Sequence, residues 1–189
     1  MMSNSPDKLA RQVTESVNTP GQPPVADWHP ELSGDMDLRI ARNGEWIFRG
    51  EPLAREAIVR LFSTILRRED DGEYYLVTPV EKWRIQVEDT PLLAHTLKVE
   101  GQGDRQVVSL TTNVGERLEI GSEHPLAVGH YPDSDEPRPV VRVRHGVDAR
   151  LVTNAFYDLA GHVVERNEEG HPVLGVFSHG IFYKIGQGG

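Results

Sequence analysis

The alternation of apolar and polar side chains in residues 76–94, LVTPVEKWRIQVEDTPLLA, is typical of a β-strand with one buried face. From residue 80 to residue 88, one face is apolar around Trp83, and the other presents Lys82 and Arg84. We therefore expect a half-buried strand here, with the tryptophan in the core and the two cations on the polar side.

Similar patterns predict strands along most of the chain. An Asn43-Gly44 turn should close the first hairpin, and further turns should follow at 101–104 and 113–115. The proline-rich segment 124–139 predicts irregular structure. The expected strands are 37–42, 45–49, 73–78, 80–88, 92–100, 105–112, 116–120, 140–144, 162–167, 172–178 and 181–186.

Two segments show helical spacing of apolar residues. The first begins at Pro52, which suits a first turn, and ends before the acidic turn at 69–72. The second covers 149–160. A short amphipathic pattern at Leu9, Val13 and Val17 precedes the helix-breaking segment NTPGQPP, so we expect residues 1–26 to be flexible or loosely docked.

The helix and its following turn occur twice, at an offset of 98 residues. Six of nine compared pairs are identical, among them Gly72 with Gly170 and Leu76 with Leu174. Any two amphipathic helices followed by acidic turns could also align this well. We predict an α+β protein of two related halves, 27–130 and 131–189, each with a helix packed on mainly antiparallel strands.

Composition narrows the class of protein. The 189 residues are 38% hydrophobic, which can fill a core, and there is no cysteine for disulfides or thiolate chemistry. We expect a soluble cytoplasmic protein, because no signal peptide or membrane span is evident. The net charge of -9 opposes binding to long nucleic acid, whereas a small anion could still bind in a locally basic pocket.

The sequence carries no recognisable catalytic or metal motif. Ser178 lies in GVFSHG, which is one residue off a nucleophile elbow and precedes a strand rather than a helix. His124, His130, Asp133 and Asp135 could converge on a metal, but solvated loop residues explain them better. We expect no metal and no cofactor.

Five residues form the candidate ligand-binding set. Arg84 can grip a phosphate or carboxylate with two hydrogen bonds, and Lys82 adds a mobile charge. Thr78 and Asn113 offer directional hydrogen bonds, and the turn at Gly115 can expose backbone N–H groups to an anion. The alternative is a solvated sheet face with cross-strand ion pairs and an ordinary turn.

The segments IVRLFSTIL, TPVEKWRI and TNVGE, with their surroundings from about residue 28 to residue 184, resemble the bacterial family Domain of Unknown Function 1285. The resemblance implies a two-part α+β protein with a repeated motif. It also implies a C-terminal part like a pleckstrin-homology barrel, a ligand site where the two parts meet, a nucleotide-like ligand and a signalling role. It assigns no catalytic activity.

We therefore predict a non-catalytic small-ligand-binding or sensory protein for an anionic or nucleotide-like ligand, held between the two halves. A hydrolase-type enzyme of unknown reaction is the first alternative. An adaptor that binds proteins through an open sheet edge is the second. The residues carry no signal for oligomeric state.

Overall fold

The computed structural model describes residues 5–16 and 22–188. The chain forms two compact units. The N-terminal unit comprises residues 1–91 with 145–147, and the C-terminal unit comprises 92–144 with 148–189. The sequence predicted a division near residue 130, whereas the units divide after Pro91, because the strand that begins at Leu92 pairs within the C-terminal sheet.

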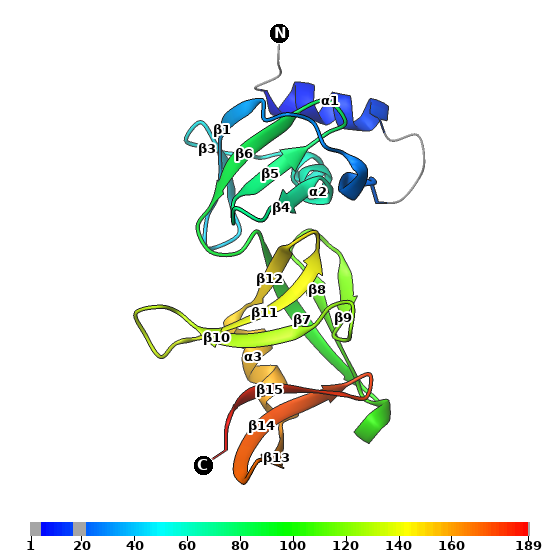
Figure 1. Ribbon diagram of the computed structural model, residues 1–189, viewed down its shortest axis with the longest axis vertical. Coiled ribbons are helices and arrows are strands. Elements are labelled where there is room, and N and C mark those ends of the chain that lie inside the picture. Colours follow the sequence, from blue (N-terminus) through cyan, green and yellow to red (C-terminus); the bar gives the residue numbers. More distant parts are fainter. Residues whose placement is uncertain (1–4, 17–21, 189) are drawn as a thin grey trace. The chain divides into compact units, whose positions relative to one another are not determined.

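The N-terminal unit is built on a six-stranded mixed sheet with the order β3-β2-β1-β6-β5-β4 (Figure 1). Neighbouring strands are antiparallel except β1 and β6, which run parallel. Alternating burial along β6 places Trp83 and Ile85 in the core, as predicted. The strands are β1 Gly34–Ile40, β2 Trp46–Phe48, β3 Glu51–Pro52, β4 Leu66–Arg68, β5 Tyr74–Val77 and β6 Lys82–Val87.

Helix α2, Glu56–Thr64, is shorter than predicted. Pro52 belongs to β3, and Leu66 begins β4, where it pairs with Leu76 of β5. The apolar run at 65–66 therefore continues the core as a strand, because pairing with β5 satisfies its backbone while both side chains stay fully buried.

The N-terminal segment docks on the unit more firmly than expected. Helix α1, Pro6–Ser16, buries Leu9 and Val13 completely and packs against α2. The Arg55 guanidinium donates a 2.7 Å hydrogen bond to Asp7, which joins the two helices. The sequence predicted a flexible or loosely docked segment, whereas two apolar side chains of 6–16 find a place in the core. Val17, the third residue of the predicted pattern, lies outside the described residues.

The C-terminal unit contains a second six-stranded mixed sheet, with the order β10-β11-β12-β7-β8-β9. Strand β12 runs parallel to β7, and the described neighbours β7-β8, β8-β9 and β10-β11 are antiparallel. Two expectations fail here. The segment 124–139 contains β10 and the start of β11, and 149–151, predicted as helix, belongs to β12. The strands are β7 Leu92–Glu100, β8 Val107–Thr112, β9 Arg117–Glu119, β10 Leu126–His130, β11 Pro137–Arg144 and β12 Val147–Leu151, and a 3-10 turn covers Gly103–Arg105.

Helix α3, Thr153–Ala160, leads into a three-stranded antiparallel sheet of β13 Val164–Glu168, β14 His171–Ser178 and β15 Ile181–Gln187. Ser178 attaches this sheet to the larger one. Its fully buried hydroxyl donates to the Ile120 carbonyl at 2.6 Å and accepts from the Val108 N–H at 3.0 Å. The serine is therefore a structural link between the two sheets.

The two units repeat a local order of elements. The order helix, strand, turn, strand, strand occurs as α2-β4-β5-β6 and as α3-β13-β14-β15. Gly72 and Gly170, 98 residues apart, take nearly the same positive φ, 81° and 84°, in the matching turns. The sheets differ. Strand β6 pairs with β1 and so belongs to a six-stranded sheet, whereas β13, β14 and β15 form a separate three-stranded sheet. Within the described residues, no helix is long and apolar enough to cross a bilayer.

Candidate functional site

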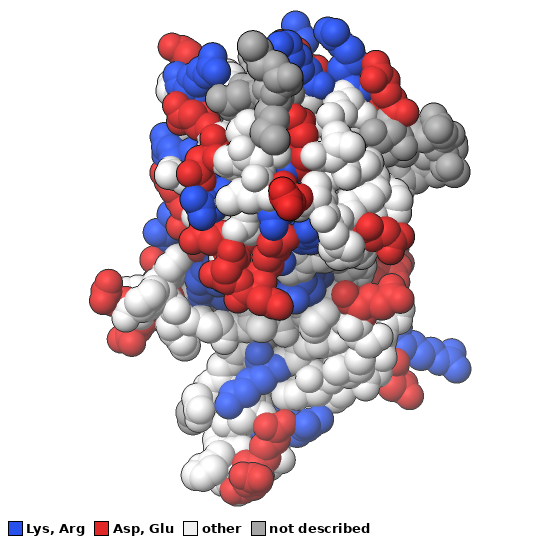
Figure 2. Space-filling model, turned by 45° about the horizontal axis from the view of Figure 1, so that its top comes forward, with Lys and Arg blue, Asp and Glu red and all other residues white. Residues whose placement is uncertain are grey.

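Charged and polar side chains form a row across one face of the N-terminal sheet. Arg67 of β4 stands opposite Tyr75 of β5, Tyr75 opposite Arg84 of β6, and Arg84 opposite Asp35 of β1. Opposed residues on neighbouring strands share a face, so these four side chains lie side by side. We call them the charged row. Figure 2 shows acidic and basic side chains next to one another on the protein surface.

Glu69 holds two cations at one end of the row. Its carboxylate accepts from Arg67 Nη2 at 2.6 Å and from Lys82 Nζ at 2.9 Å. The side chains of Arg67, Lys82 and Glu69 are only 13%, 17% and 25% exposed. Burial raises the pKa of Glu69, but the hydrogen bonds from Lys82 and Arg67 outweigh it and hold that pKa below its usual range.

The other contacts of Arg67 and Lys82 are structural. Arg67 Nη1 donates to the carbonyls of Val25 and Trp28 at 3.0 and 2.8 Å, which fixes the chain that enters the unit. The Lys82 ammonium lies 4.7 Å from the centre of the Tyr75 ring, a cation–π contact. Lys82 is thus an internal cation of the sheet face rather than a mobile charge.

Tyr75 and Asp71 form the middle of the face. The Tyr75 hydroxyl donates to Asp71, and this bond, with burial, raises the pKa of Tyr75 to about 12. The same bond lowers the pKa of Asp71, with help from the Glu73 N–H. Tyr75 is only 4% exposed, so the charged side chains beside it cover its ring.

Arg84 and Asp35 form the most accessible pair of the row. Arg84 Nε donates to Asp35 Oδ1 at 2.5 Å and Nη2 to Oδ2 at 3.1 Å, so the two groups meet as a two-pronged pair. Their side chains are 40% and 68% exposed. The hydrogen bond from Arg84 lowers the pKa of Asp35, and the same bond raises the pKa of Arg84.

Thr78 is completely buried and its hydroxyl is used locally. It accepts from the N–H groups of Glu81 at 2.9 Å and Val80 at 3.3 Å, which closes the turn between β5 and β6. The proline at position 79 therefore sits in a turn that Thr78 stabilises, and the hydroxyl orders the start of β6, which carries Lys82 and Arg84.

Asn113 and Gly115 lie in the C-terminal unit, in the turn between β8 and β9. The Asn113 side chain accepts from the Leu93 N–H at 3.1 Å, and its own N–H donates to the Leu93 carbonyl at 2.9 Å. The Gly115 N–H donates to Thr112, and Gly115 has the expected positive φ, 88°. Both N–H groups are occupied, so the turn does not present them as the predicted anion nest.

The structure thus divides the predicted set. Thr78, Lys82 and Arg84 lie in the N-terminal unit. Of these three, only Arg84 is substantially exposed, and its guanidinium can donate two hydrogen bonds to a ligand. Sequence reasoning missed Asp35 and Glu69 as partners. The polar alternation on β1 was a signal for Asp35, but the parallel pairing of β1 with β6, 49 residues apart, was not predictable from local pattern.

Two hollows of more than 500 Å³ have both cations and carboxylates in their walls. One, of about 510 Å³, lies in the N-terminal unit beside the charged row, with Arg67, Glu69 and Asp71 among its walls. The other, of about 740 Å³, lies on the three-stranded sheet, with Arg166 and Lys184 among its walls. Lys184 has no acidic partner within the described part of the chain, whereas Arg166 pairs with Glu168 at 2.6 Å and stacks on Phe182.

The exposed Arg84 side chain can exchange Asp35 for an anion from solution. An anion that approaches Arg84 competes with Asp35, whose carboxylate is exposed and free to turn into water. Water and salt screen an exposed ion pair, which lowers the cost of this displacement. The arrangement is suited to reversible binding of a phosphate or carboxylate.

The fold and the charged row define a two-domain α+β protein with a polar sheet face. Residues 23–90 match the family model "Domain of unknown function (DUF1285), N-terminal domain", and residues 91–185 match "Protein of unknown function (DUF1285), C-terminal domain". The chain belongs to the DUF1285 family. The two matches meet where the compact units divide.

Solved structures agree with this membership. A DUF1285 family protein from Silicibacter pomeroyi DSS-3 is 39% identical, with a TM-score of 0.85, over 98% of this chain and 97% of that one. A DUF1285 family protein from Shewanella baltica OS155 is 27% identical, with a TM-score of 0.52, over 66% of this chain and 91% of that one. No curated protein matches the chain.

Proposed function

We propose that this protein is a non-catalytic small-ligand-binding protein with a sensory or signalling role, and that it recognises an anionic, nucleotide-like ligand through Arg84. The observation that carries the proposal is the exposed two-pronged pair of Arg84 with Asp35. The guanidinium is already oriented to bind two oxygens, and the side chain of its present partner, Asp35, is 68% exposed.

The energetics favour exchange at this pair over exchange at Glu69. A ligand that displaces Glu69 must separate it from Arg67 and Lys82, which are mostly buried and depend on that carboxylate. A ligand that displaces Asp35 separates it only from Arg84, which water already reaches. A phosphate forms the same two charge-assisted bonds with Arg84 and carries more negative charge than one carboxylate, so it can displace Asp35.

A thermal-shift screen of nucleotides, cyclic nucleotides and small organic acids tests the proposal. A ligand at 100 times its Kd stabilises the folded protein by about 2.7 kcal/mol through mass action. We expect at least one phosphate- or carboxylate-bearing compound to raise Tm in a saturable way. Turnover of that compound during incubation would instead support the enzyme alternative.

Three variants then locate the site. Arg84→Ala should weaken binding of the stabilising compound at least tenfold, since it removes the guanidinium that donates two hydrogen bonds. Asp35→Asn should strengthen binding about threefold, because it removes the carboxylate that competes with the ligand for Arg84. Arg39→Ala is the matched control, because Arg39 lies on neighbouring strand β1, is 41% exposed, and has a partner of its own, Glu88.

The opposite results are equally clear. If Arg84→Ala binds the compound as well as the unmodified protein does, the charged row is structural and the proposal for this site is wrong. If Lys184→Ala alone abolishes binding, the ligand occupies the hollow of the three-stranded sheet.

We also infer that the two units arose by internal duplication. The shared order of α2-β4-β5-β6 and α3-β13-β14-β15, and the matching φ of Gly72 and Gly170, support this. Superposing the two four-element segments tests the inference, and a different path of the third strand would contradict it. The likeness of the C-terminal unit to a pleckstrin-homology barrel stays a prediction of the same kind.

A further inference from the structure

A third hollow, of about 210 Å³, lies in the C-terminal unit at a distance in sequence from every residue of the charged row. Three elements form it: the hairpin of β10 and β11, the end of β12, and helix α3. Neither the proposed anion site nor the repeat of elements accounts for it.

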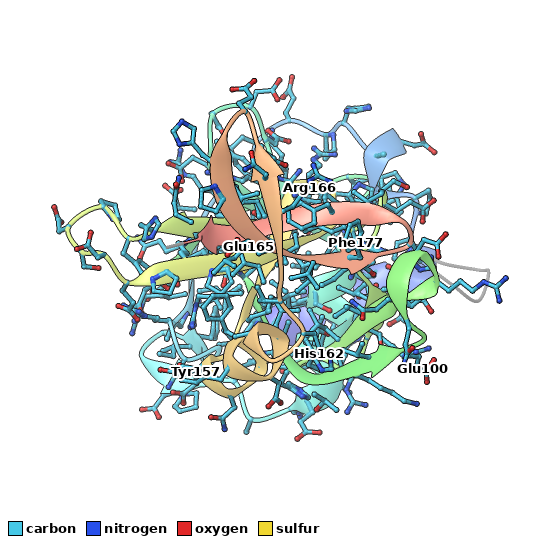
Figure 3. The ribbon with its side chains drawn as sticks, turned by 90° about the horizontal axis from the view of Figure 1, so that it is seen from below. Glu100, Tyr157, His162, Glu165, Arg166 and Phe177 are labelled. Carbon is cyan, nitrogen blue, oxygen red and sulfur yellow. The ribbon has the colours of Figure 1, made fainter. Side chains whose placement is uncertain are left out.

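Three of the nine residues in its walls are aromatic. Tyr131, Phe156 and Tyr157 contribute rings from the hairpin and the helix. The Tyr157 side chain lies on the outside of α3 (Figure 3), and the residue is 69% exposed, which is unusual for a large ring on a helix. Rings of this kind bind apolar molecules by stacking or edge contacts.

Two prolines form another part of the wall. Pro137 and Pro139 stand on β11, where each fixes its own φ. The hairpin that carries them is closed by a 3.1 Å hydrogen bond from the Tyr131 N–H to the Glu136 carbonyl. A wall of this kind loses little conformational freedom on binding, so the hollow is largely formed in advance.

Size and charge limit the occupant. An apolar cavity of about 150 Å³ holds benzene, so about 210 Å³ accommodates one substituted ring. Arg150 and Glu136 both line the hollow, and their opposite charges favour neither an anion nor a cation. Thr153 also lines it, and its hydroxyl has no hydrogen-bond partner within residues 5–16 and 22–188, so this residue can supply a hydrogen bond to one polar substituent.

We propose that this hollow is a binding site for a small neutral aromatic molecule of one ring that carries a hydroxyl group. The ring packs against Phe156 and Tyr157, and the hydroxyl bonds to Thr153. This site is separate from the anion site proposed at Arg84, and either proposal can fail without the other.

Phenol is the probe, followed by two-dimensional ¹H–¹⁵N NMR on the full chain. We expect saturable shifts of the backbone amide signals of α3, with a Kd on the order of 1 mM, because so small a ligand buries little surface. Benzoate and benzylamine carry the same ring with opposite charges, and each should bind at least threefold more weakly than phenol.

Two substitutions on one helix give a matched comparison. Thr153→Phe places a ring in the hollow and should weaken phenol binding at least tenfold. Asn154→Phe makes the same kind of change at the next residue, which does not line the hollow, and should leave Kd within about twofold. Tyr157→Ala removes an exposed ring, so the variant should fold, and it should weaken binding about fivefold.

Absence of saturable shifts up to 20 times the expected Kd would overturn the proposal. So would equal binding by Thr153→Phe and Asn154→Phe, which would place phenol elsewhere. Tighter binding of benzoate or benzylamine than of phenol would show that one of the two charges governs the site, and the neutral ligand class would be wrong.

Discussion

Replacing Glu69 with alanine should destabilise the N-terminal unit, because one carboxylate neutralises two mostly buried cations. The change removes the 2.6 Å bond from Arg67 and the 2.9 Å bond from Lys82. It leaves an ammonium and a guanidinium that are 17% and 13% exposed without that counter-charge. The free energy of unfolding should fall through lost attraction and through the cost of burying uncompensated charge.

The burial of the cluster sets the magnitude. Breaking a fully buried pair costs about 3 to 5 kcal/mol, and an exposed pair contributes under about 1 kcal/mol. Glu69 is 25% exposed and lies between these limits, so Glu69→Ala should cost about 2 kcal/mol. Glu69→Gln keeps one acceptor oxygen and should cost about half as much.

Urea unfolding followed by tryptophan fluorescence measures this directly. All three tryptophans, Trp28, Trp46 and Trp83, belong to the N-terminal unit, so the signal reports on the unit that carries the substitution. Trp46 and Trp83 are 2% and 6% exposed, which should give a large change in emission on unfolding.

Glu31→Ala is the control, since Glu31 is exposed and has no ion pair within the described residues. It should change the free energy of unfolding by less than about 0.5 kcal/mol. If Glu69→Ala costs no more than this control, the cluster of Glu69, Arg67 and Lys82 does not stabilise the sheet, and the assignment of Lys82 as an internal cation is wrong.

Three further predictions concern stability. The pKa of Glu69 is lowered in the folded state, so its contribution to the free energy of unfolding is present above the ordinary value of 4.5 and is lost as pH falls through the folded pKa. Below pH 4.5, the free energy of urea unfolding should therefore depend less steeply on pH in Glu69→Gln. Gly175→Ala should cost about 2 to 3 kcal/mol by circular dichroism, because a Cβ would lie 2.5 Å from the Tyr183 carbonyl oxygen, and the prediction fails if the loss is under about 0.5 kcal/mol. Ser178→Ala should cost about 1 to 3 kcal/mol, because it leaves the Val108 N–H and the Ile120 carbonyl without the hydroxyl that they bond to. Ser122→Ala, at an exposed position, should be neutral.

Much of the local structure could be predicted from the sequence. The alternation around Trp83 predicted the buried and polar faces of β6. The glycines at 72 and 170 predicted turns, and both residues have positive φ there. These features depend on neighbouring residues alone, because the side-chain period and the allowed φ are properties of a short stretch of chain.

The helix boundaries depended on partners elsewhere in the chain. Residues 149–151 were expected to begin the helix 149–160, yet Ala149 and Leu151 pair with β7 and are almost completely buried. Likewise, Leu66 leaves the predicted helix to pair with Leu76. Strand pairing and burial together outweigh a local preference of a few tenths of a kcal/mol per residue.

The sequence alone therefore determined which residues are polar, which face of β6 they share, and that Arg84 has the chemistry to hold an anion. The tertiary structure decided which of these groups are available. Arg84 meets Asp35 only because β1 and β6 pair in parallel across 49 residues, and Lys82 is held inside because Glu69 follows β4. The free energy of an ion pair depends on distance and burial, and both are set by long-range pairing that local sequence does not encode.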